Sequence, residues 1–250
     1  MNHPNIVRYV ERINLREEKK IYIVMEFCEN GDMSQLIKKC KQDKDFVAED
    51  VIWKIFMQIL LALRECHYRS IKGSKILHRD LKPSNIFFDS NNNVKLGDFG
   101  LSRIIKDDSS DGQVPELAQT NVGTPYYMSP EQINENNYDE KTDIWSLGCV
   151  IYELVALMPP FTASSHLALA EKIINGQISR IPDRYSEDLQ EVIQRMLQVN
   201  PQKRPTVEDL LKLPKIKLRI HERKMRDQYS KIKYKEYKIE KRSNDLKAKQ

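Results

Sequence analysis

Acidic, amide and basic side chains that could handle a metal-bound phosphate gather in one stretch, residues 76–100. The stretch places Asp80, Lys82 and Asn85 within six residues, and a short apolar run separates them from Asp98. Carboxylate and amide oxygens are the hard ligands that Mg²⁺ prefers. A lysine ammonium is a mobile point charge that can neutralise a phosphoryl group. These residue types therefore indicate phosphoryl transfer.

Two motifs in this stretch carry a resemblance to a known family. The segment HRDLKPSN at 78–85, the expected catalytic loop, is followed by DFG at 98–100. This order resembles the catalytic core of eukaryotic protein kinases, H-R-D-x-K-x-x-N followed by D-F-G. The segment GTPYYMSPE at 123–131, together with FCENGDM and KLGDFGLSRI, is similar to the NIMA-related serine/threonine kinases. The resemblance covers residues 1–213.

The resemblance implies a chemical role for each polar residue of these motifs. Asp80 would accept the proton of the substrate hydroxyl, and Lys82 would neutralise the transferring phosphate. Thr124 would bond to both and help to select hydroxyl substrates. Asn85 and Asp98 are the expected Mg²⁺ ligands, with ATP as the phosphate donor.

Nucleotide binding is expected beside a β-hairpin near the N-terminus. Residues 20–27, KIYIVMEF, are rich in β-branched and aromatic side chains and predict a strand that pairs with the segment before it. By resemblance this strand leads into the hinge, residues 26–28, where the backbone of Glu26 and Cys28 would pair with adenine. Met25 would be the gatekeeper, a core residue that faces the pocket. Phe87 would be the floor under adenine, or alternatively an ordinary strand residue.

Further residues are expected to have regulatory or structural roles. Thr120 lies where many family members are phosphorylated, and Arg79 would pair with that phosphate. An unmodified loop threonine is the alternative. Asp143, in the first turn of a buried helix, is expected to brace the catalytic loop by accepting backbone N–H groups. Glu131 and Arg204 are expected to form a buried ion pair.

The expected fold is α+β and of the protein-kinase type. A complete, mostly helical large lobe is expected over residues 31–213, after a small lobe reduced to a hairpin over residues 1–30. The pattern predicts short strands at 86–88 and 94–96, and helices over 32–43, 48–68 and 142–155. His78 is expected to pack against the Phe99 ring. The apolar stripe predicted as core in the second helix is Val51, Ile52, Ile55, Phe56, Ile59, Leu60 and Leu63.

Some family motifs have no counterpart in the 250 residues, because the resemblance begins inside the kinase domain. The Gly-rich loop, the small-lobe lysine and the helix with its partner glutamate are missing. An incomplete product, which the intact later motifs favour, and a natural fragment without normal nucleotide handling both stay open. Two functions follow: a serine/threonine kinase that phosphorylates protein hydroxyls, or a non-catalytic scaffold that binds protein partners.

Composition excludes several classes of protein. Hydrophobic residues make up 40% and charged residues 31%, as in a globular chain. The longest apolar stretch, residues 55–63, is too short to cross a bilayer, and the N-terminus lacks a secretory signal pattern. Four widely spaced cysteines argue against a disulfide framework and a zinc site. The expected location is cytoplasmic, and the family adds cytoskeletal, centrosomal or nuclear sites.

A basic segment, residues 214–250, is expected to follow the large lobe as a long helix. Residues 215–250 hold 14 Lys or Arg and 5 Asp or Glu, a charge of +9. A heptad of apolar residues suggests a homodimeric coiled coil, although the companion positions three residues on are polar. A solvated charged helix is the alternative, and no specific nucleic-acid or membrane partner is expected. The heptad residues are Leu218, Met225, Ile232, Ile239 and Leu246.

Overall fold

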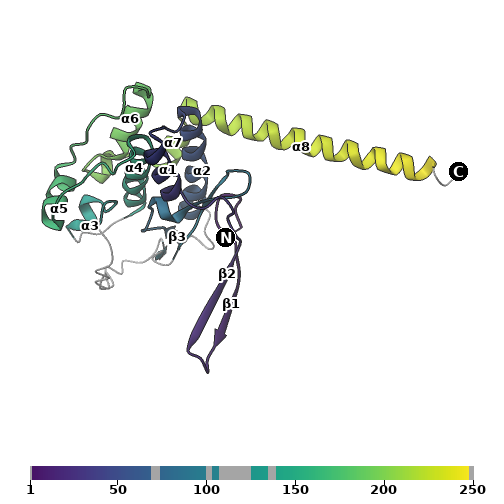
Figure 1. The fold of residues 1–250 in the computed structure, drawn as a ribbon, viewed down its shortest axis with the longest axis horizontal. Helices are drawn as coiled ribbons and strands as arrows, with labels where there is room; N and C mark the ends of the chain where they lie inside the picture. Colours follow the sequence, from purple (N-terminus) through teal and green to yellow (C-terminus); the bar gives the residue numbers. More distant parts are fainter. Residues whose placement is uncertain (1, 69–73, 100–102, 107–124, 135–138, 248–250) are drawn as a thin grey trace.

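The computed structural model describes residues 2–68, 74–99, 103–106, 125–134 and 139–247. A mostly helical body carries a projecting β-hairpin and a long helix that leaves the body in another direction (Figure 1). The α-helices of the described residues are α1 (Met33–Asp43), α2 (Glu49–Tyr68), α3 (Pro130–Ile133), α4 (Glu140–Ala156), α5 (His166–Asn175), α6 (Glu187–Met196), α7 (Val207–Leu211) and α8 (Pro214–Lys247). Short 3₁₀ helices are η1 (Pro83–Asn85) and η2 (Pro201–Lys203). The α+β, kinase-like fold expected from the sequence is confirmed.

The strands pair as two-stranded antiparallel sheets. The hairpin joins β1 (Tyr9–Leu15) to β2 (Lys20–Met25). A second sheet pairs β3 (Ser74–Leu77) with β6 (Arg103–Lys106). The third pairs β4 (Ile86–Phe88) with β5 (Val94–Leu96) and lies inside the body, directly after the catalytic loop. The strands predicted at 86–88 and 94–96 are thus confirmed.

Polar caps fix where the helices around the site begin. Asp32 precedes α1 and accepts a hydrogen bond from the backbone N–H of Gln35. Asp139 caps α4 in the same way through the N–H of Lys141. Such side chains satisfy backbone donors that have no partner within the helix. The cap at Asp139 fixes the start of α4, the helix whose first turn carries Asp143.

Helices α2 and α4 form the centre of the core. Nearly every residue of α4 is buried, as the apolar sequence predicted, and the Trp145 ring stacks on Phe161 at 5.6 Å between centroids. Most of the predicted α2 stripe is fully buried. Val51 is the exception, because it is 45% exposed and lines an open groove between α2 and α8 with Met225. The expectation that Val51 belongs to the core is therefore wrong.

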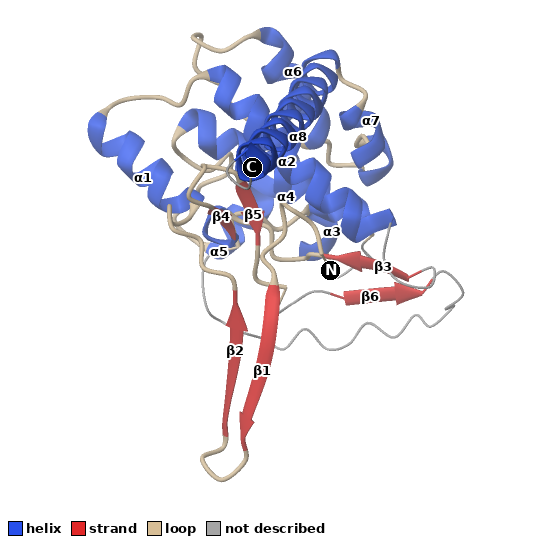
Figure 2. Cartoon of the chain, turned by 90° about the vertical axis from the view of Figure 1, so that its right-hand side faces the viewer, coloured by secondary structure: helices blue, strands red, loops and turns tan. Residues whose placement is uncertain are grey.

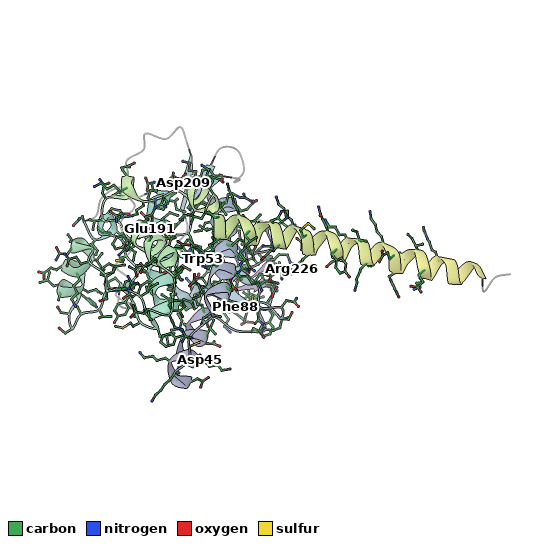
Figure 3. All side chains as sticks on the ribbon, turned by 90° about the horizontal axis from the view of Figure 1, so that it is seen from above. Asp45, Trp53, Phe88, Glu191, Asp209 and Arg226 are labelled. Carbon is green, nitrogen blue, oxygen red and sulfur yellow. The ribbon has the colours of Figure 1, made fainter. Side chains whose placement is uncertain are left out.

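The long helix α8 has an anchored start and a projecting remainder (Figure 1, Figure 3). Ile216 is fully buried and Ile220 packs on the core. The heptad residues Leu218, Met225, Ile232 and Ile239, by contrast, are exposed. The predicted long helix is confirmed, whereas a coiled coil stays a prediction. None of the helices in the described ranges is both long and apolar enough to cross a bilayer.

The β1–β2 hairpin extends away from the body (Figure 2). Every residue of its two strands is exposed, including Ile21 and Ile23. Met25, expected to be a core residue, is 53% exposed. That expectation is wrong for this chain, because both strands of the hairpin are exposed along their whole length. The division into residues 1–30, 31–213 and 214–250 stays a prediction.

Candidate active site

Asp143, in the first turn of α4, holds the backbone of the catalytic loop. Its Oδ2 accepts a hydrogen bond from the N–H of His78 at 3.0 Å, and its Oδ1 accepts one from Arg79 at 2.9 Å. His67, near the end of α2, donates a third from Nε2 at 2.8 Å. Burial alone would raise the pKa of Asp143, but these donors hold that pKa below its usual value. The bracing role predicted for Asp143 is confirmed.

Asp80, Lys82 and Asn85 converge in front of this brace. Lys82 Nζ donates to Asp80 Oδ2 at 2.8 Å. Asn85 Nδ2 donates to the same oxygen at 3.0 Å and to the Asp80 carbonyl at 2.8 Å. The short helix η1 makes this possible, because it turns the chain so that Asn85 faces back toward Asp80. The structure therefore brings together the candidate base, the candidate cation and one candidate metal ligand.

Asp98 reaches the same region through the end of β5. The N–H of Gly97 donates to the Asn85 carbonyl at 3.0 Å, which joins the two candidate metal ligands through backbone. Asp98 has φ of +55°, and Arg79 has φ of +67°. Residues other than glycine seldom adopt this left-handed region, and such strain persists only where the surroundings impose it. Arg79 of the loop and Asp98 of the DFG segment are therefore held in backbone conformations that these residue types disfavour.

His78 ties the catalytic loop to the DFG segment. Its Nε2 donates to the Gly97 carbonyl at 3.0 Å, and its ring lies 4.8 Å from the Phe99 ring, as predicted. Burial lowers the pKa of His78, although the neighbouring Asp143 carboxylate opposes this shift. His78 is thus a hydrogen-bond donor that fixes the position of the DFG segment against the loop.

The donor set fits magnesium. Both amide hydrogens of Asn85 are directed to Asp80, so its Oδ1 is the atom left to face a cation, and Asp98 adds a carboxylate. Across the described ranges, no group of three or more His, Cys, Asp or Glu side chains could hold a metal by itself. Mg²⁺ matches such a sparse site, because it commonly takes one or two protein carboxylates, keeps several waters and uses substrate phosphates.

The hinge is fastened to the β4–β5 sheet. Glu26 pairs with Lys95 of β5 at 2.6 Å, and its N–H donates to the Arg8 carbonyl. Burial, then the nearby Glu26 carboxylate, raise the pKa of Cys28. Beyond the hinge, Phe88 and Gly31 pair through the backbone at 2.9 Å. The adenine-binding roles of Met25, Glu26 and Cys28 stay predictions.

Phe87 lies against the residue that precedes Asp98. A Cβ atom added to Gly97 would stand 2.8 Å from the Phe87 ring and 2.9 Å from the Val7 side chain. Only glycine allows this close approach without displacement of its neighbours. Phe87 therefore has a packing role next to the site, and its role as the adenine floor stays a prediction.

The predicted ion pair between Glu131 and Arg204 is confirmed. Two parallel hydrogen bonds of 2.7 and 2.8 Å join the guanidinium to the carboxylate, and both side chains are buried. The Arg204 guanidinium also lies 4.9 Å from the Trp145 ring. Burial alone would raise the pKa of Glu131, but the hydrogen bonds and charge of Arg204 lower it. This pair joins α3 to the segment before α7.

Sequence reasoning missed several residues that complete the site. His67 and Lys95 carry no local signal, because their partners Asp143 and Glu26 lie 76 and 69 positions away in the sequence. Tyr127 also went unnoticed, although its hydroxyl donates to Glu153 of α4 at 2.6 Å. The predicted sites Thr120 and Thr124 lie outside the described residues.

Comparisons with known proteins agree with this geometry. The family model of the protein kinase domain matches residues 1–216. Serine/threonine-protein kinase Nek2 of Homo sapiens is 53% identical over 216 residues, which cover 86% of this chain and 47% of Nek2. The probable serine/threonine-protein kinase nek2 of Dictyostelium discoideum is 47% identical over 233 residues, 93% of this chain and 54% of the relative.

A fungal relative extends the comparison. The G2-specific protein kinase nimA of Emericella nidulans is 41% identical over 240 residues, which cover 87% of this chain and 33% of nimA. The chain spans about half the length of the two Nek2 relatives that it matches. The family model covers most of the chain, and these relatives share one branch of the family. The chain therefore belongs to the protein kinase family, within its NIMA-related serine/threonine kinases.

Proposed function

We propose that the chain transfers the γ-phosphate of Mg–ATP to serine and threonine hydroxyls of protein substrates. The observation that carries the proposal is the hydrogen-bonded group of Asp80, Lys82 and Asn85, held on Asp143. Kinases of this kind work by positioning and charge neutralisation more than by covalent chemistry. A rigid polar group of this type supplies both.

Each residue has a separate task in the proposed reaction. Asp80 orients the substrate hydroxyl and accepts its proton as the oxygen bonds to phosphorus and the bond to ADP breaks. Lys82, which lies 2.8 Å from Asp80, balances the charge of the moving phosphoryl group. Asn85 and Asp98 would hold Mg²⁺, which shields the phosphate charges when bound. Thr124 would bond to Asp80 and Lys82 and help to select hydroxyl substrates.

The nucleotide would lie between the hinge and the β4–β5 sheet. The hinge backbone at Glu26 and Cys28 would pair with adenine, Phe87 would lie beneath the ring, and Met25 would border the pocket. The Glu26–Lys95 ion pair supports this placement, because it fixes the hinge against the strand that leads to Asp98.

Phosphate transfer from labelled ATP to a serine peptide tests the proposal. The purified chain should label the serine peptide but not the same peptide with alanine at the acceptor position. Asp80→Asn should abolish labelling, because the amide cannot accept the hydroxyl proton, while the melting temperature stays the same. Equal labelling by the wild type and Asp80→Asn would refute Asp80 as the base. No labelling by folded wild-type protein would favour the scaffold function.

We also propose three properties of the wider protein. Phosphorylation of Thr120 would provide a phosphate group that can pair with Arg79.

The exposed apolar row of α8 would pair with the same row of a second copy of the chain. Light scattering of the wild type and of Ile232→Glu tests this pairing. The wild type should be a dimer, and Ile232→Glu should be a monomer. We place the protein in the cytoplasm, since its cysteines are free thiols. Fractionation of cells that express the protein would test the location.

A further inference from the structure

An arginine of the C-terminal helix makes contact with the loop that precedes the β-hairpin. Arg223 Nη1, in α8, donates to Asn5 Oδ1 at 2.7 Å, across 218 positions of sequence. The Arg223 side chain is half-buried, and Asn5 is fully buried. A buried amide must satisfy its hydrogen bonds within the protein. The Arg223 contact therefore forms part of an internal polar network.

Asn5 is also hydrogen-bonded to strand β5 and so connects Arg223 to that strand. Its Nδ2 donates to the Val94 carbonyl at 2.8 Å and to Gln58 Oε1 at 3.2 Å. The backbone carbonyl of Asn5 accepts a hydrogen bond from the N–H of Leu96 at 2.9 Å, and the N–H of Val7 donates to the Leu96 carbonyl at 2.8 Å. Asn5 and its neighbours thus cover the free edge of β5, opposite β4.

The Arg223 contact agrees with the other contacts on how the Asn5 amide is turned. A guanidinium can only donate hydrogen bonds, so the oxygen of the Asn5 amide must face Arg223. The nitrogen then faces the two acceptors, the Val94 carbonyl and Gln58 Oε1. Gln58 in turn accepts the N–H of Val94 with the same oxygen. The Val94 carbonyl and N–H fix the same direction, so the contribution of Arg223 is the hydrogen bond to the buried Asn5 oxygen, which would be lost without it.

Strand β5 ends two residues before Asp98, the candidate metal ligand. We propose that Arg223 is a positioning residue for phosphotransfer: it holds Asn5, which holds β5 and thereby the place of Asp98. The inference depends on the proposed kinase function for its chemical consequence. The coupling between α8 and β5 itself does not depend on that function.

Arg219 offers a matched control one turn earlier on the same helix. Its guanidinium pairs with Asp50 of α2 and with Glu222 of α8. Asp50 is largely exposed, and this pair has no bond to β5. Arg219→Met and Arg223→Met each remove one positive charge from the same part of α8. Only Arg223→Met removes the hydrogen bond to Asn5.

Amide hydrogen exchange tests the coupling without metal or nucleotide. In the full chain, Arg223→Met should speed exchange of the Leu96 amide about tenfold, the factor expected for one weakened buried hydrogen bond. Arg219→Met and the donor-preserving Arg223→Lys should leave it within about twofold of the wild type. Exchange in α4 serves as the internal reference. Equal exchange of Leu96 in the two methionine variants would overturn the proposal.

Magnesium dependence of phosphotransfer tests the chemical consequence. The Mg²⁺ concentration for half-maximal rate should rise several-fold in Arg223→Met, with the KM for the acceptor peptide unchanged. Arg223→Lys should restore it, and Arg219→Met should not alter it. A change in peptide KM alone would contradict a role in placing Asp98. If the wild type shows no transfer, the proposed function fails, while the exchange experiment still decides the coupling.

Discussion

The catalytic loop and the β1–β2 hairpin are both short segments without a regular helix, yet they are held in opposite ways. The loop is fixed by Asp143 of α4, which accepts hydrogen bonds from two backbone N–H groups of the loop and is itself held by His67 of α2. The hairpin is held by its own ladder, and both of its faces are exposed. Strain is tolerated at Arg79 of the loop and at nearby Asp98, which both have positive φ, because the surroundings impose it.

This contrast shows which segments depend on tertiary contacts for their conformation. Buried polar groups that are fully paired can hold a loop in a conformation that its sequence disfavours. A two-stranded hairpin is marginal by itself and depends on whatever packs on it. Substitutions should therefore have large effects around the loop and small effects in the hairpin.

The largest effect is expected at the buried ion pair. Arg204→Met leaves the Glu131 carboxylate buried without its cation and should lower the free energy of unfolding by about 3–5 kcal/mol. Urea unfolding measures the loss. The control is Arg180→Met, which removes an arginine from the exposed pair with Glu187 and should change nothing measurable. Similar losses in both variants would contradict the account.

The next largest effect is expected at the brace beneath the loop. Asp143→Asn places an amide donor against N–H donors and should lower the free energy of unfolding by about 2 kcal/mol. Phosphotransfer should fall more, by about 100-fold, because the loop moves. Asp139→Asn, on the same helix, is the control, since asparagine caps helices as well as aspartate. Retained activity in Asp143→Asn would show that the loop needs no brace.

A smaller effect is expected from the pH dependence of His78. Burial lowers its pKa, so the folded state stays neutral while the unfolded imidazole binds a proton as pH falls below 6.5. Stability should therefore fall with pH in this range, by up to about 1.4 kcal/mol per unit. His78→Gln keeps a donor for the Gly97 carbonyl but does not titrate, so urea unfolding at pH 7.5 and 5.5 should differ less. An unchanged pH slope would exclude His78 as the source.

The smallest effect is expected in the hairpin. Ile21→Thr, at a position 59% exposed, keeps a β-branched side chain and should change the free energy of unfolding by less than about 0.5 kcal/mol. The same substitution at Ile59, fully buried in α2, should lose several times more. Thermal melting of both variants measures the difference. Equal losses would mean that the hairpin packs on something in solution.

The sequence was sufficient for features that local patterns determine. The spacing of Asp80, Lys82 and Asn85 predicted a group that the structure brings together. Helical periodicity located α2 and α4, and the absence of glycine and proline located α8. These predictions succeed because a few consecutive residues decide them.

The sequence was insufficient where the answer depends on distant packing. The pattern placed Val51 in the core, but only the position of α8 shows that it borders an open groove. Likewise, nothing near Arg223 indicates that it meets Asn5 across 218 positions. Burial of Met25 was wrongly expected, because it was inferred from the gatekeeper position of the family and not from residues of this chain that cover the strand.

The most direct measurement is a double-mutant cycle on the rate of phosphate transfer with Asn85→Ala and Asp98→Ala. If both side chains hold one magnesium ion, each single variant should lose most of the rate, and the double variant should lose no more than the worse single variant. Losses that multiply would mean that the two residues act independently, and would contradict a shared metal site.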